Sequence, residues 1–188
     1  MELVTKLSLG TAVQNRHELR VQRAQRLHDC GWPGARQPFQ KYLLSIPEIP
    51  KELFFAAQHA GAHLILADER MFFRDMCRQL TIWFPLGAQK YLAVDLEPSH
   101  ENSVYWFAVQ FESGKFPDQG ITIRQGMFVY AQFPHLFWDE PIVCSCTYIG
   151  NSFQYRACFM RDTGAYSLGV VDATVTRSFM APAILSYA

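Results

Sequence analysis

The stretch that decides the fold is residues 141–176, PIVCSCTYIGNSFQYRACFMRDTGAYSLGVVDATVT. Apolar and polar residues alternate along three runs within it, which is the period of β-strands. Between the runs stand IGNS and RDTG, in which Asn151 and Gly164 can adopt the positive φ of a tight hairpin turn. The pattern predicts three consecutive antiparallel strands.

The same alternation extends back toward the middle of the chain. It predicts three more strands, at KYLAVDLE (90–97), SVYWFAVQFE (103–112) and ITIRQGMFVYAQF (121–133). We therefore expect a five- to six-stranded antiparallel sheet between residues 90 and 176.

Before residue 90 the apolar period is helical. KELFFAAQHAGAHLILA (51–67) and DERMFFRDMCRQLTIWF (68–84) predict two helices or one long bent helix, with Gly61 as a weak point. Helices packed on one face of an antiparallel sheet make an α+β domain.

The N-terminal residues predict a helix of their own. LVTKLSL (3–9) is typical of a short strand, and the helix that follows is capped by Thr11 or Asn15 and runs to about His28. Glycine and proline residues between 30 and 38 end it.

Length and composition indicate one globular unit. The chain has 188 residues, of which 49% are hydrophobic and 18% charged, so a sizeable core can form. We divide it into a basic helical segment, residues 1–40, and an α+β domain, residues 41–188, which form one structural unit.

Cysteine usage and hydropathy indicate a cytoplasmic protein. The five cysteines are an odd number without the spacing of a disulfide framework, which favours reduced thiols. No apolar run approaches the length of a membrane span, and the first residues lack the pattern of a signal peptide.

Charge is unevenly distributed although the chain is neutral as a whole. Residues 1–41 hold seven Lys and Arg against three Asp and Glu, a net charge of +4, and the remainder carries −4. In QNRHELRVQRAQRLHDC (14–30) the arginines fall within about a third of the helix circumference. The candidate binding residues are these arginines and two residues just beyond the helix, namely Arg16, Arg20, Arg23, Arg26, Trp32 and Arg36.

Three kinds of partner could satisfy the arginines of this stripe. The phosphates of a nucleic acid suit the planar guanidinium group, and an acidic protein surface offers carboxylates to the same donors. The third possibility is that the acidic remainder of the chain, or water, satisfies the arginines.

Candidate catalytic residues are few. His59 and His63 stand four residues apart, the spacing that grips a metal on a helix, but Ala60 replaces the glutamate of the metalloprotease motif. His63, Asp68 and Glu69 are weak candidates for acid or base catalysis at the mouth of a pocket. We expect no metal and no cofactor.

The cysteines of the predicted hairpin allow two arrangements. A loop at Gly150–Asn151 places Cys158 beside Val143, whereas a three-residue loop places it against Cys144. Only the second arrangement gathers three thiols, together with Cys146. We interpret these cysteines as small apolar core residues.

The run 141–176 is similar to strands of hotdog-type acyl-thioester enzymes, over under a fifth of the chain and without a catalytic motif. The resemblance implies an acyl-type ligand and, if the chain is an enzyme, a hydrolase or lyase. A cone-like sheet with an aromatic pocket for a small apolar ligand fits the same pattern. The 27 aromatic residues could line such a pocket or a partner surface, but we expect them chiefly to form a bulky core.

The leading hypothesis is a non-catalytic binding or regulatory protein. Its arginine-rich helix would contact nucleic acid or an acidic protein, without a membrane, and an exposed strand such as 165–176 could mediate a homodimer. The alternative is the hotdog-like or cone-like enzyme or carrier.

Overall fold

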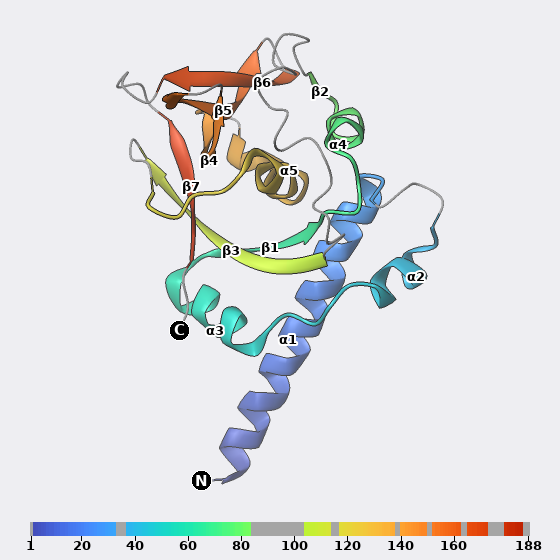
Figure 1. The fold of residues 1–188 in the computed structure, drawn as a ribbon. Helices are drawn as coiled ribbons and strands as arrows, with labels where there is room; N and C mark the ends of the chain where they lie inside the picture. The colour runs from blue at the N-terminus through green and yellow to red at the C-terminus, as the bar shows by residue number, and fades with distance from the viewer. Residues whose placement is uncertain are drawn as a thin grey trace.

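A computed structural model describes residues 2–32, 37–83, 104–113, 117–137, 140–149, 152–162, 165–172 and 179–185. Over these residues the chain is α+β, as the sequence predicts, with a seven-stranded sheet (Figure 1). In chain order the elements are α1 (Glu2–Asp29), α2 (Phe39–Leu44), α3 (Lys51–Ala60), β1 (His63–Asp68), α4 (Phe73–Gln79), β2 (Ile82–Trp83), β3 (Val104–Ser113), α5 (Ile123–Gln132), the 3-10 helix η2 (Pro134–Phe137), β4 (Ile142–Ile149), β5 (Ser152–Asp162), β6 (Ala165–Asp172) and β7 (Met180–Ile184).

The sheet is mixed, which corrects the prediction of an antiparallel sheet of five to six strands. Its order is β1-β3-β7-β4-β5-β6-β2, and two neighbouring pairs, β7 with β4 and β6 with β2, run parallel. The strands that create these parallel pairs, β2 and β7, are short and were not predicted. Within the sheet β6 pairs with β5 along its length and with β2 at Tyr166 and Ser167.

The predicted hairpins are confirmed. β4, β5 and β6 pair as consecutive antiparallel strands, and the predicted strand 103–112 is β3. Cys158 pairs with Val143, as the two-residue loop requires. The predicted strand 90–97 and the turn residues Asn151 and Gly164 lie outside the described residues.

The predicted strand 121–133 is wrong, because these residues form α5. Thr122 caps the helix: its hydroxyl accepts from the Gln125 amide nitrogen, and the Gln125 side chain accepts from the Thr122 amide nitrogen in return. Eight of the ten helical residues are buried. The first residues of the predicted strand, ITIR (121–124), alternate between apolar and polar residues, which is the pattern of a strand, and the prediction followed that alternation.

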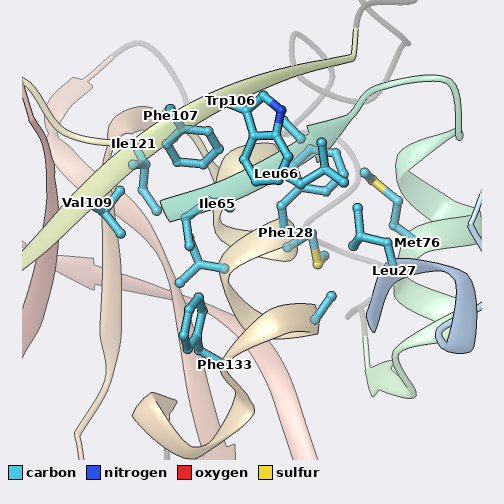
Figure 2. Close-up of a cluster of buried hydrophobic side chains, with 14 of the residues drawn as sticks. Leu27, Ile65, Leu66, Met76, Trp106, Phe107, Val109, Ile121, Phe128 and Phe133 are labelled. Atoms are coloured by element: carbon cyan, nitrogen blue, oxygen red, sulfur yellow. The ribbon is translucent and has the colours of Figure 1, made fainter. Parts of the chain in front are cut away.

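The sheet curls around α5, which lies between β1 and β3 on one side and β4 and β5 on the other (Figure 1). The main hydrophobic cluster fills the space around this helix, and Phe128 of α5 meets residues of β1 and β3 there (Figure 2). Phe133, the residue after α5, lies beside Ile65 at one end of the labelled cluster (Figure 2).

The helical prediction for residues 51–84 is wrong over its middle. Gly61 ends α3 with a left-handed φ of 63°, and residues 63–68 form β1, which pairs antiparallel with β3. Five of its six residues are buried. A short apolar run of this kind has the same appearance in a buried strand and in a buried helix, so the pairing with β3 decides between them.

The predicted strand 3–9 and the caps at Thr11 and Asn15 are wrong, because α1 begins at Glu2. Helix elongation adds a hydrogen bond for each residue, whereas a strand without a neighbour gains none. The N-terminal half of α1 projects away from the sheet (Figure 1). Its C-terminal half packs on the core through Ala24 and Leu27. No helix among the described residues is long and apolar enough to cross a membrane.

Candidate functional site

Arg20, in the middle of the predicted stripe, is bonded within the fold. Its guanidinium group donates to the carbonyl oxygen of Ile46 from Nε and Nη2, at 3.2 and 2.7 Å, and to that of Leu43 at 3.0 Å. Nη1 lies 2.9 Å from the carboxylate of Glu48. Arg20 therefore ties α1 to the end of α2 and to the segment that follows it.

Arg23 is half-buried and has no carboxylate partner among the described residues. Its Nε donates to the carbonyl oxygen of Leu64 at 3.0 Å, and its Cζ lies 4.2 Å from the centroid of the Phe133 ring. Burial, followed by the nearby charge of Arg26, lowers the pKa of Arg23 to about 10. The aromatic face stabilises the cation, but no negative charge within the described part of the chain neutralises it.

Two histidines surround the same phenylalanine ring. The His63 ring centroid lies 4.8 Å from that of Phe133, and the His135 ring lies 6.1 Å from it. Burial lowers the pKa of His63, and the positive charges of Arg23 and His135 lower it further. We call Arg23, Arg26, His63 and His135 the basic cluster.

The basic cluster is assembled from three separate elements. The C-terminal half of α1 supplies Arg23 and Arg26, the first residue of β1 supplies His63, and η2 supplies His135. Arg26 and His135 are exposed, whereas Arg23 and His63 are half-buried. No carboxylate lies within ion-pair distance of the two arginines in the described ranges. An anion arriving from solvent would therefore meet several unneutralised donors.

A groove of about 330 Å³ opens beside the basic cluster. Its lining comes from the turn after α3, the ends of β1, β3 and β7, and η2, and consists of Gly61, His63, Gln110, Phe111, Leu136 and Met180. We call it the end groove. His63 belongs to both features, because its ring also lies 5.9 Å from that of Phe111.

Of the other predicted binding residues, Trp32 lies in the core and Arg16 on the partly buried side of α1. The Trp32 indole is fully buried and donates to the carbonyl oxygen of Asp68 at 3.1 Å. Arg16 has its Nε enclosed without a hydrogen-bond acceptor. Arg36 lies outside the described residues.

Asp68, a weak catalytic candidate, is fully buried and firmly bonded. Arg70 donates to its carboxylate from Nε at 2.7 Å and from Nη2 at 2.6 Å, and the Tyr42 hydroxyl donates at 3.0 Å. Burial first, and the adjacent carboxylate second, raise the pKa of Tyr42. A carboxylate held by a cation and a phenol stabilises its surroundings and is poorly placed to accept a substrate proton.

Glu69 and Tyr105 form a second polar contact. Glu69 is 9% exposed and accepts from the Tyr105 hydroxyl at 2.9 Å. Burial and then the Glu69 charge raise the pKa of Tyr105. The side chain of Gln125 in turn donates to the Tyr105 oxygen at 3.3 Å. The two carboxylate candidates are thus held at one end of β1 and His63 at the other.

The paired-histidine and three-thiol arrangements do not form. His59 lies in α3 and His63 in β1, with the left-handed Gly61 between them, so they share no helical face. Over the described residues no group of three metal-ligating side chains is found. Cys144 and Cys158 are buried, and Cys146 is exposed.

Sequence reasoning missed Phe133 and His135. The sequence predicts a strand over residues 121–133 and offers no reason to expect that Phe133 and His135 meet His63. The sequence does contain a usable sign, since FPH (133–135) places an aromatic ring and a base on either side of a helix-initiating proline.

Comparison with known proteins gives no match to this chain, whether with a family model, a curated protein or a solved structure.

Proposed function

We propose that this chain is a non-catalytic binding protein that contacts an acidic protein partner through the basic cluster. One observation carries the proposal: Arg23, His63 and His135 surround Phe133, and no carboxylate among the described residues pairs with Arg23 or Arg26. Half-buried cations are costly unless they are paired, so a partner carboxylate would gain a strong charge-assisted contact.

An acidic protein suits this site better than a nucleic acid. Tight phosphate binding draws on many exposed cations along a surface. Of the four arginines in the stripe, Arg20 is bonded to carbonyl groups and Glu48, Arg16 and Arg23 are half-buried, and Arg26 is exposed. A compact set of donors with an aromatic ring at its centre fits one or two carboxylates.

The contacts of the carboxylate candidates favour a binding role over catalysis. Asp68 and Glu69 are engaged with Arg70, Tyr42 and Tyr105. His63 is left as the base that could serve a reaction in the end groove. The acyl-ligand enzyme or carrier is therefore the second candidate, and the groove that His63 lines is the observation in its favour.

The test is fluorescence anisotropy of a labelled hexaglutamate peptide, with labelled single-stranded RNA and duplex DNA as separate titrations, at about 50 and 200 mM salt. We expect the peptide to bind more weakly at the higher salt, and Arg26→Glu to weaken binding at least about tenfold. Arg78→Glu is the matched control, since Arg78 is an exposed helical arginine that pairs with Asp75 on α4.

Two outcomes would contradict the proposal. Absence of peptide binding at the lower salt would remove the acidic partner. Binding of RNA or DNA in preference to the peptide, again lost in Arg26→Glu, would assign the basic cluster to phosphates instead.

A further inference from the structure

The end groove and the basic cluster are continuous. The His63 ring stands between the rings of Phe133 and Phe111, at 4.8 and 5.9 Å, and so forms the boundary between the two features. In η2 the same transition occurs between consecutive residues, because the exposed His135 precedes Leu136 of the groove. A ligand that contacts the basic cluster at His63 therefore lies next to the groove.

The lining of the end groove suits an apolar group. Phe111, Leu136 and Met180 supply its apolar surface, and all three are only partly buried. A methionine thioether adapts its shape to the group it contacts. Gln110 is the amide of the lining, and its side chain already donates to the carbonyl oxygen of Ala60. The volume, about 330 Å³, is at the lower end of the range for binding pockets.

We infer that the partner inserts one apolar side chain into the end groove while a carboxylate next to it in the partner binds the basic cluster. The inference rests on the proposed function and adds the kind of segment that is recognised. Charge complementarity selects an acidic segment. Because His63 borders both the groove and the cluster, the apolar and acidic side chains must project from the same side of that segment. In an extended peptide this corresponds to residues i and i+2.

In this arrangement the carboxylates and the apolar side chain of the partner contribute to binding in different ways. The carboxylates steer the segment and set its salt dependence, whereas the apolar side chain supplies the part of the affinity that salt does not screen. Burying one leucine side chain is expected to strengthen binding by about tenfold or more.

The experiment compares two labelled peptides, Glu-Glu-Glu-Leu-Glu-Glu and Glu-Glu-Glu-Ser-Glu-Glu, by anisotropy with the unmodified chain. We expect the leucine peptide to bind at least about tenfold more tightly. Leu136→Ser is expected to abolish this preference while the affinity for the serine peptide is retained. Leu44→Ser, at an 85% exposed leucine of α2, is the matched control and is expected to keep the preference.

A second measurement guards against a folding defect in Leu136→Ser. Its thermal unfolding, followed by circular dichroism, is compared with that of Leu44→Ser. If Leu136→Ser unfolds at a clearly lower temperature than Leu44→Ser, the binding experiment is repeated with Met180→Gln, because Met180 lines the groove from β7 instead of η2.

The outcomes separate the two proposals. Equal affinity for both peptides, unchanged in Leu136→Ser, overturns the groove inference and leaves the proposed function standing. Binding of neither peptide overturns both. If decanoate binds and Leu136→Ser weakens it while neither peptide binds, the groove takes a free apolar carboxylate, which contradicts a protein segment as its occupant.

Discussion

The two ends of β1 carry charged groups in opposite situations. At one end Asp68 is fully buried, and Arg70 and Tyr42 satisfy its carboxylate. At the other end His63 and Arg23 lie around Phe133 with no carboxylate beside Arg23 in the described part of the chain. The first arrangement is complete by itself, and we regard it as structural. The second lacks its counter-charge, and we regard it as a binding site.

The largest effect is expected at the Asp68 end. Asp68→Asn leaves Arg70 without its counter-ion and weakens the hydrogen bond from Tyr42, so it should lower the free energy of unfolding by about 3 kcal/mol. Urea denaturation measures this change. Asp75→Asn is the control, because Asp75 and Arg78 form an exposed pair at 3.4 Å and should contribute less than about 1 kcal/mol. If the two variants lost equal free energy of unfolding, the buried Asp68–Arg70 pair would contribute no more to stability than the exposed Asp75–Arg78 pair.

Arg23→Gln, at the other end of β1, should affect binding more than stability. The substitution removes a half-buried cation that has no carboxylate partner in the described ranges, and loses one hydrogen bond to Leu64. We expect a stability loss of about 1 kcal/mol together with at least about tenfold weaker hexaglutamate binding. Arg20→Gln, at the arginine bonded to Leu43, Ile46 and Glu48, should lose more stability than Arg23→Gln. Urea denaturation and anisotropy would contradict this contrast if the two variants behaved alike.

The smallest effect is a pH dependence that comes from His63. Its pKa in the folded chain lies below the ordinary 6.5, mainly because of burial, so the unfolded chain takes up the proton more readily. The free energy of unfolding should therefore fall as the pH drops through 6.5, and His63→Gln should remove part of that fall. The measurement is urea denaturation between about pH 5 and 8.

The predictable parts of the fold were those fixed by local chemistry. The hairpins β4 to β6 follow from alternation and turn residues next to each other in the chain. Gly61 was predicted only as a weak point of the helical region, and in the structure it ends α3. The prediction for β1 was wrong because a short buried apolar run looks the same in a strand and in a helix. The prediction for α5 was wrong because ITIR (121–124) alternates in the manner of a strand.

The candidate site was predictable only in part for a related reason. The spacing of the arginines showed the stripe, but not that Arg20 would bond with residues 23 to 28 positions away. Likewise, His63 was selected for its spacing from His59, whereas the structure associates it with Phe133 and His135, 70 residues or more further along. Which charges are neutralised depends on the tertiary fold, and no local pattern records it.

The most direct test of the central claim is a proton NMR titration of the His63 ring with and without hexaglutamate. If the basic cluster at the His63 end of β1 binds carboxylates, the added negative charge should favour the imidazolium form and raise the pKa of His63. An unchanged His63 pKa at a saturating peptide concentration would contradict the account, because no carboxylate would then have reached the basic cluster.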